Sequence, residues 1–225
     1  MENIIFLFTS HWMDFLKGTG VTLRVTFIGL LLGMALGLPL ALMRTYGSKP
    51  VSKFAETYIA LFRGTPLMVQ LFLIYFGLPD FGITLERLTA ACISLGLNSA
   101  AYQAEYFRGA FTSIGLGQMM AARALGMSKI KAIFYIIIPQ ALRLVVPGWA
   151  NEAIGMLRAS SVIFLIAILD VMGVGKVLSG RYFTPMASYS AVAIIYVILV
   201  LSMGWGLNKL ENSLRIPGLQ VELRK

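Results

Sequence analysis

The sequence from Met120 to Pro139, MAARALGMSKIKAIFYIIIP, places a short basic segment directly before a long apolar run. Its alanine-rich start favours helix, and Gly126 is placed to end that helix because glycine tolerates the left-handed conformation. The hydroxyl of Ser128 can then cap the next helix. We therefore predict a compact helix and a capped turn at a membrane surface, where a soluble partner can bind.

The composition is typical of an integral membrane protein. Of the 225 residues, 58% are hydrophobic and 13% are charged, and the mean hydropathy is +0.79. A soluble domain of this length cannot bury so much apolar surface. The net charge of +9 therefore reports orientation in a bilayer and not binding to nucleic acid. With one cysteine, Cys92, and one histidine, His11, we expect no internal disulfide, no metal site and no catalytic constellation.

Five stretches have the roughly 20 apolar residues that are needed to cross a bilayer core of about 30 Å. They are Gly20 to Met43, Phe54 to Pro79, Leu85 to Phe107, Ala132 to Leu157 and Met186 to Asn208. A sixth run, Val162 to Gly175, is too short and contains Asp170, so we expect it to pack at the membrane surface. The predicted fold is one all-α membrane domain, residues 1–225, with five transmembrane helices.

The two ends of the chain are predicted to lie outside the spans. The first 17 residues have the wrong charge order for a cleaved signal peptide, and we interpret them as an amphipathic N-terminal segment. The stretch from Glu211 to Lys225 is expected to form a short charged tail in the cytoplasm.

The distribution of basic residues predicts the orientation. With the N-terminus outside, the inner segments hold eleven Lys and Arg residues, and the outer segments hold four. The four outer residues are Lys17, Arg87, Lys176 and Arg181. Since cytoplasmic segments are enriched in Lys and Arg, this asymmetry favours an N-out, C-in topology. The Met120 segment then faces the cytoplasm, where nucleotide is available.

Four polar motifs interrupt or follow the apolar stretches. They are Arg63 to Leu67 with Val69, Gln70 and Leu71; Asn98, Ala101, Tyr102, Ala104, Glu105, Arg108 and Gly109; Gly117, Gln118, Ala121, Ala122, Arg123, Leu125 and Gly126 with Pro139 to Ala141; and Pro147, Asn151, Glu152 and Leu157. Together, and in this order, they resemble the signatures of permease subunits of bacterial and archaeal ABC importers, in the polar amino acid branch. The third motif is similar to the EAA loop of that family.

The resemblance implies a non-catalytic subunit with the type I ABC importer permease architecture, embedded in the inner or plasma membrane of a prokaryotic cell. Its partners would be a second permease subunit, identical or homologous, two ATP-binding subunits, and an extracytoplasmic binding protein that delivers a polar amino acid. ATP and Mg²⁺ would be bound by the ATPase and no cofactor by this chain. Consistently, the run Gly173 to Lys176 lacks the leading glycine and the following Ser or Thr of a nucleotide-binding loop.

The resemblance also implies that residues 117–126 form the coupling helix, which lies in a groove of the ATPase. The implied docking residues are Gln118, Met120, Ala121, Ala122, Arg123, Leu125 and Gly126. Met120 departs from the family, because a glutamate that commonly pairs with a basic residue of the ATPase falls at this position. We therefore expect packing by Met119, Met120 and Leu125 to carry more of the contact.

Polar residues at membrane depth are costly, so each one is a candidate site residue. The candidates for the substrate path are Asn98, Tyr102, Glu105, Asn151, Glu152 and Arg158. The first three share one face of the third span, and Asn151 and Arg158 share a face of the fourth, with Glu152 one step round the helix. Two such faces could line a polar path through the membrane.

An α-amino acid in this path could place its ammonium against Glu152 and its carboxylate against Arg158. Two alternatives remain open. Glu105 could instead pair with Arg108 or a neighbour at the cytoplasmic end of its span. Glu152 could form a structural ion pair with Arg143 or Arg158, or with the dimer partner.

The second span is interrupted by Arg63, Gly64, Thr65 and Pro66. Proline frees a backbone carbonyl and disfavours helix at Thr65, so a kink is expected there. Arg63, Thr65 and Pro66 could form a flexible joint or gate beside the path. Alternatively, the kink is static and the Arg63 side chain reaches the inner head groups.

Glycine and proline predict further features of the spans. Gly29, Gly33 and Gly37 form a G-x-x-x-G-x-x-x-G face on the first span, which allows another helix to approach closely. Pro139 and Pro147 are expected to bend the fourth span.

The main functional hypothesis is therefore a transport subunit that is powered by a partner ATPase. The substrate can be a polar amino acid, with Glu152 favouring a cationic one and glutamine remaining open. Alternatives are an ABC permease for another small solute and a subunit of an ion-gradient-driven carrier. A membrane enzyme is disfavoured because the chain has little material for a catalytic constellation.

Overall fold

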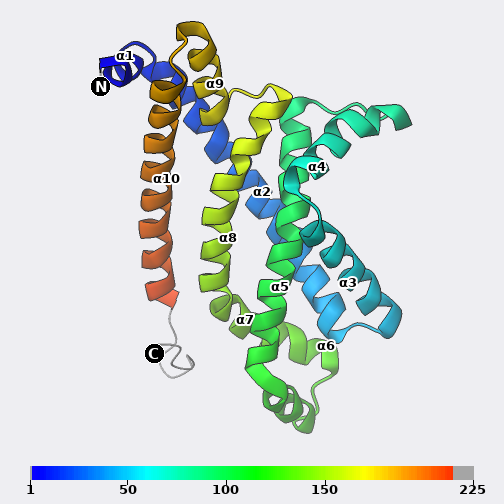
Figure 1. Cartoon of the computed structure of the whole chain (residues 1–225). Coiled ribbons are helices and arrows are strands. Elements are labelled where there is room, and N and C mark those ends of the chain that lie inside the picture. The colour runs from blue at the N-terminus through cyan, green and yellow to red at the C-terminus, as the bar shows by residue number, and fades with distance from the viewer. Residues whose placement is uncertain (1, 215–225) are drawn as a thin grey trace.

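The structure of the chain is a computed structural model that describes residues 2–214. Within this range all regular elements are helical (Figure 1). In chain order they are α1 (Glu2–Ser10), α2 (Trp12–Tyr46), α3 (Lys49–Gly64), α4 (Leu67–Phe72), η1 (Leu73–Gly77), η2 (Leu78–Phe81), α5 (Arg87–Ala124), α6 (Lys129–Ala132), η3 (Ile133–Ile137), α7 (Ile138–Leu144), α8 (Val146–Ala159), η4 (Ser160–Ile166), α9 (Val171–Tyr182) and α10 (Pro185–Leu214). The predicted all-α fold is confirmed for these residues.

Helix α5 lies inside the bundle and packs along α2 (Figure 1). On one side of α5 lie α3 and α4, and on the other lies α8, while α10 packs against α8 and α9. The core beside α5 is made largely of small residues such as Ala100 and Ala104 together with Phe107. This central position of α5 brings its polar face next to both the broken second span and α8.

The close approach of α2 and α5 depends on the predicted glycine face. A Cβ atom added at Gly33 would lie 2.5 Å from Nε2 of Gln103, and one added at Gly37 would lie 2.9 Å from the carbonyl oxygen of Ala100. On α5, a Cβ at Gly96 would lie 2.7 Å from Cβ of Leu32. The G-x-x-x-G-x-x-x-G face is therefore a packing surface within this subunit, as small residues allow.

Within residues 2–214, two helices, α2 and α10, are long and apolar enough to cross a membrane, and two bent helix pairs raise the candidates to four. The 38-residue α5 is not among these candidates, although the sequence predicts its first half as the third span. Polar residues such as Asn98, Gln103 and Glu105 lower its hydropathy. Helix α5 packs against α2, α3 and α8, and the Gln103 side chain is buried within the protein.

The predicted second span is not one helix. Helix α3 ends at Gly64, the next helical segment starts at Leu67, and the two axes meet at 103°. Thr65 has φ −115° and ψ 144°, the extended conformation that a following proline imposes. The expected kink is therefore confirmed, and it is a complete break in the helix.

The predicted fourth span is also bent, by 54° between the segments Lys129–Leu144 and Val146–Ile166. Pro147 lies in the first turn of α8, where its missing N–H costs no helical hydrogen bond. Pro139 lies near the start of α7, directly after the π-helical turn η3. Pro147 thus lies next to the 54° bend, as predicted, whereas Pro139 lies within the segment Lys129–Leu144, after its π-helical turn.

The run from Val162 to Gly175, which is predicted to pack at the membrane surface, forms parts of two helical elements, η4 and α9. Its first half continues from α8 as η4, and Ile163 and Ile166 are buried in the core. Asp170 then caps α9, since its Oδ1 accepts a hydrogen bond of 2.8 Å from the backbone nitrogen of Gly173. The Asp170 side chain is fully buried, and this burial raises its pKa to about 6.

The ends of the chain adopt more helix than predicted. The N-terminal segment divides at His11 into α1 and the first turns of α2, and Leu7 and Phe15 from the two parts pack against α9 and α10. At the other end, α10 continues to Leu214, so the predicted tail begins within a helix. The rest of that tail, residues 215–225, lies outside the described residues.

Candidate functional site

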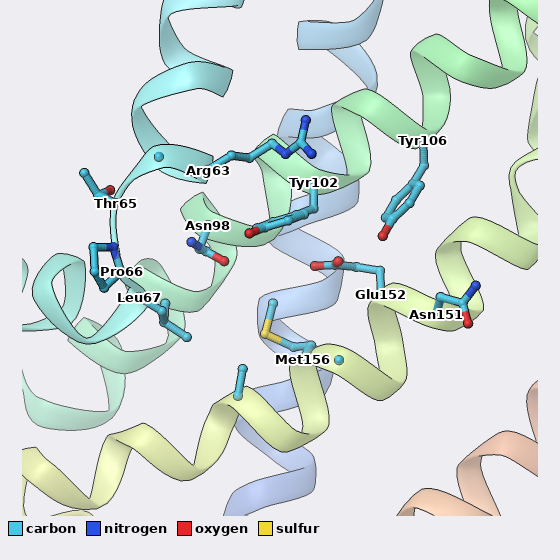
Figure 2. A pocket seen from close by; sticks show the side chains of 13 residues that line it. Arg63, Thr65, Pro66, Leu67, Asn98, Tyr102, Tyr106, Asn151, Glu152 and Met156 are labelled. Atoms are coloured by element: carbon cyan, nitrogen blue, oxygen red, sulfur yellow. The ribbon is translucent and has the colours of Figure 1, made fainter.

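A cavity of about 550 Å³ lies between the break in the second span and helices α5 and α8 (Figure 2). It is lined by the predicted path residues Asn98, Tyr102, Asn151 and Glu152 and by the predicted gate residues Arg63, Thr65 and Pro66. Leu67, Tyr106, Gly155, Met156 and Ala159 complete most of its wall. The structure therefore brings together residues from three regions of the sequence around one polar space.

Two predicted path residues, Glu105 and Arg158, do not line this cavity. Arg158 lies in the last turn of α8, and its Nε donates to the carbonyl oxygen of Ile154 at 3.4 Å. The cavity wall on α8 is formed instead by positions 151, 152, 155, 156 and 159. The arginine at the cavity is Arg63, and not Arg158 as predicted for the substrate path.

Glu152 is the acidic group of the cavity. Its residue is 8% exposed, and its Oε1 accepts a hydrogen bond of 2.7 Å from Oγ of Ser99 on α5. Among the side chains that the structure describes, it forms no ion pair, so the alternative pairings with Arg143 and Arg158 are not found within this subunit. An acidic group without an ion-pair partner among the described residues is thus placed beside an open polar space.

Arg63 connects the cavity to a cluster of charges behind it. Its guanidinium carbon lies 5.2 Å from the ring centroid of Tyr102, within the range of a cation–π interaction, and Figure 2 shows the arginine extended toward that ring. Its Nη1 also lies 3.9 Å from Oε2 of Glu105. Arg63 is therefore positioned between the cavity and Glu105.

Glu105 is the centre of an ion-pair cluster that joins three helices. Its carboxylate pairs with Arg44 from α2 and Arg63 from α3, and with Nη2 of Arg108 on its own helix at 2.9 Å. The Glu105 side chain is 17% exposed. The structure thus shows the alternative role for Glu105, pairing with Arg108 and neighbours, and not a position on the cavity wall.

Two amide side chains brace the break in the second span. Nε2 of Gln70 donates to the carbonyl oxygen of Phe62 and to Oγ1 of Thr65, both at 2.8 Å. Nδ2 of Asn98 donates to Oε1 of Gln70 at 3.0 Å and to the same Phe62 carbonyl at 3.2 Å. These bonds satisfy a carbonyl that the ending helix leaves unpaired.

Gln70, Ser99 and Gln103 were not among the site residues predicted from the sequence. Gln70 is the polar residue in the run LMVQLF, directly after the break, and this isolated polarity was the available signal. Ser99 and Gln103 lie one helical turn apart on α5, and small or neutral polar residues on a helix carry little information about which neighbour they meet.

The implied coupling residues lie at the end of α5 and in the turn after it (Figure 1). Helix α5 continues without a break to Ala124, so the compact helix predicted at residues 117–126 is the last part of the long helix α5. Gly126 has φ +83°, and the nitrogen of Met127 donates to the carbonyl oxygen of Ala122 at 3.1 Å, as in a glycine-ended helix. Oγ of Ser128 accepts from the nitrogen of Lys131, so both predicted caps are confirmed.

This segment presents apolar side chains to solvent. Met120 is 64% and Leu125 is 84% exposed, whereas Met119 packs against the core of its own subunit. The turn is attached to the end of α2, since Nζ of Lys129 donates to the carbonyl oxygen of Tyr46 at 2.8 Å. Two of the three residues expected to carry the docking contact are therefore accessible.

Residues 29–216 match the family described as binding-protein-dependent transport system inner membrane component. The chain is 38% identical over 181 residues to the probable amino-acid ABC transporter permease protein YckA of Bacillus subtilis, which covers 80% of each chain. It is 34% identical over 203 residues to the glutamine transport system permease protein GlnP of Escherichia coli, covering 89% of this chain and 93% of GlnP.

Among solved structures, the chain is similar to one described as an amino acid ABC transporter with histidines. The sequence identity is 36%, the TM-score is 0.84, and the match covers 91% of this chain and 96% of the other. Proteins of this family are membrane-embedded transport components and not catalysts, and they act with ATP-binding subunits and a substrate-binding protein. The glycine-packed helices, the polar cavity and these matches together show that the chain belongs to the family of binding-protein-dependent transport system inner membrane components.

Proposed function

We propose that this chain is the permease subunit of an ATP-driven importer of polar amino acids in a prokaryotic cell membrane. The observation that carries the proposal is the cavity, in which Glu152 and Arg63 line the same space of about 550 Å³. An α-amino acid carries an ammonium and a carboxylate, which these two charged groups can bind at its two ends. The relatives named for amino-acid or glutamine transport support the same substrate class.

In this proposal each lining residue has a chemical task. Glu152 accepts hydrogen bonds from the substrate ammonium. Arg63 binds the substrate carboxylate, a role that was predicted for Arg158. Asn98 and Asn151 add amide groups that can donate and accept. A space of this volume accommodates a small molecule of amino-acid size with room for its side chain.

The proposed assembly contains two copies of the permease, identical or homologous, two ATP-binding subunits that carry ATP and Mg²⁺, and an extracytoplasmic binding protein. The exposed Met120 and Leu125 support docking of the ATPase at the end of α5. The excess of basic residues in the inner segments supports an N-out, C-in topology, with this docking surface in the cytoplasm. ATP-driven closure of the ATPases would then switch the cavity between the two sides of the membrane.

Replacing Glu152 with glutamine tests the substrate assignment. We expect uptake of L-glutamine, L-histidine and L-arginine by the complete transporter in proteoliposomes to fall about tenfold, because a charge-assisted hydrogen bond to the ammonium contributes about 1.5–3 kcal/mol. Glu56→Gln is the matched control, since Glu56 is an exposed acid on α3 that pairs only with Lys53 among the described residues. Unchanged uptake by Glu152→Gln would reject the substrate role. Uptake without ATP would favour an ion-gradient carrier instead.

Met120→Glu is expected to be tolerated in the assembled transporter. In the isolated chain the Met120 side chain is 64% exposed, so glutamate meets no steric conflict within the subunit, and it restores the acid that the family resemblance implies at this position. Ala122→Glu is the contrasting variant, because Ala122 is only 4% exposed and a carboxylate there would be buried. Copurification of the ATP-binding subunit measures both variants, and its loss with Met120→Glu would show that an acid is not tolerated at this position.

A further inference from the structure

We propose that Ser99 and Gln103 are positioning residues that hold the Glu152 carboxylate at the cavity, and that they thereby set the preference of the transporter for substrates with an ammonium group. This inference rests on the proposed function, in which Glu152 contacts the substrate. Neither residue lines the cavity, so both act through Glu152 and not by touching the substrate.

The three residues form a chain of hydrogen bonds that crosses three helices. Nε2 of Gln103 donates to the carbonyl oxygen of Leu30 on α2 and to Oγ of Ser99, both at 3.0 Å. Oγ of Ser99 in turn donates to Oε1 of Glu152 on α8 at 2.7 Å. The chain therefore runs from the backbone of α2 through α5 to the carboxylate.

The direction of each bond in this chain is fixed by the chemistry of the groups. The amide nitrogen of Gln103 has two hydrogens, and the Leu30 carbonyl and the Ser99 hydroxyl use both. Turning the amide over would place its oxygen against the Leu30 carbonyl, so that two acceptors would face each other. With Gln103 donating to it, the Ser99 hydroxyl keeps its one hydrogen for Oε1 of Glu152, which an ionised carboxylate can only accept.

Burying Ser99 and Gln103 lowers the stability of the fold, which argues for a role of these residues beyond packing. Ser99 is 0% and Gln103 is 1% exposed, and Oε1 of Gln103 is buried without a hydrogen-bond partner among the described residues. An unsatisfied buried acceptor costs about 1–3 kcal/mol, which an apolar residue of similar shape would avoid. The helix opposite also leaves room for the pair, since a Cβ at Gly33 would lie 2.7 Å from Oγ of Ser99 and 2.5 Å from Nε2 of Gln103.

The consequence for Glu152 is a carboxylate whose orientation is set before the substrate arrives. Ser99 holds Oε1, and among the described side chains no group is hydrogen-bonded to Oε2, which leaves that oxygen for a ligand. Figure 2 shows the Glu152 side chain extending from α8 toward Tyr102 across the cavity. A group that is oriented in advance binds its partner at a lower entropic cost.

Ser99→Ala in the complete transporter, with its ATPase and binding protein in proteoliposomes, tests this role. We expect the uptake of L-glutamine, L-histidine and L-arginine to fall about fivefold, and Ser99→Thr, which keeps the hydroxyl, to restore most of it. Gln103→Met, which removes the donor but keeps the length of the side chain, should give a smaller loss of the same kind. Ser94→Ala is the matched control on α5, because the Ser94 hydroxyl is equally buried but has no partner in the described structure.

The double variant Ser99→Ala/Glu152→Gln separates positioning from a general structural role. If Ser99 acts through Glu152, the double variant should transport no less than the Glu152→Gln variant alone. If the two residues act independently, the losses of uptake in the two single variants should multiply. Multiplied losses, or wild-type uptake by Ser99→Ala beside an impaired Glu152→Gln, would overturn this inference and leave the proposed function standing. Wild-type uptake by Glu152→Gln itself would overturn this inference together with the substrate role of Glu152.

Discussion

Glu105→Gln is expected to destabilise the subunit by about 3 kcal/mol, because it removes the carboxylate at the centre of an ion-pair cluster. In the structure the Glu105 carboxylate pairs with Arg44, Arg63 and Arg108, and the surrounding helices leave its side chain 17% exposed. With glutamine in its place, three guanidinium groups remain close together, and their mutual repulsion acts across α2, α3 and α5. The thermal or denaturant unfolding of the purified transporter measures this loss.

A second acid on α3 provides the control for this prediction. Glu56 pairs with Lys53 at 3.1 Å, but the two side chains are 49% and 74% exposed. Solvent screens such a pair, so Glu56→Gln should cost less than about 1 kcal/mol. Removing one of the repelling charges, in Glu105→Gln/Arg108→Gln, should recover part of the loss. Equal stability of the Glu105 and Glu56 variants would show that the cluster does not hold the three helices together.

Gly33→Leu is expected to prevent stable packing of α2 against α5. A Cβ at this position would already lie 2.8 Å from Cβ of Ser99, an atom that moves only with its backbone, and leucine adds three more carbons. Overpacking of this kind costs about 1–3 kcal/mol or more, so we expect little folded protein after purification. Gly33→Ala should give a partial loss that is seen as a lower unfolding temperature.

Gly20 on the same helix is the matched control for the loss at Gly33. It is exposed, and an added Cβ would meet no atom within 4 Å. Gly20→Ala should therefore leave the unfolding temperature unchanged or raise it slightly, since alanine favours helix over glycine. A Gly33→Leu variant that purifies with the unfolding temperature of the unmodified protein would contradict the close approach of the two helices.

Local chemistry made several features of the fold predictable. The left-handed Gly126, the cap from Ser128 and the break before Pro66 depend on the conformational preferences of one or two residues. The helical period placed Gly29, Gly33 and Gly37 on one face, and the structure shows that face in contact with α5. These predictions needed no knowledge of which helix lies opposite.

The pairing of charges across helices was not predictable in this way. From the sequence, Arg158 shares a helical face with Asn151, yet the cavity wall of α8 includes Ala159 and not Arg158. Arg63 lines the cavity beside the 103° bend that follows Gly64. The amides of Gln70 and Asn98, which belong to two different segments, both donate to the carbonyl oxygen of Phe62 at that bend.

The sequence by itself determined that this is a helical membrane protein, where its helices break, and which motifs it shares with ABC permeases, because composition, helical period and turn chemistry are local properties. Only the tertiary structure decided that Glu152 has Ser99 as its neighbour, that Arg63 is the arginine of the cavity, and that Glu105 belongs to a separate ion-pair cluster. The physical reason is that the rotation and crossing of packed helices follow from how all their side chains fit together, and a helical period specifies a face but not its partner.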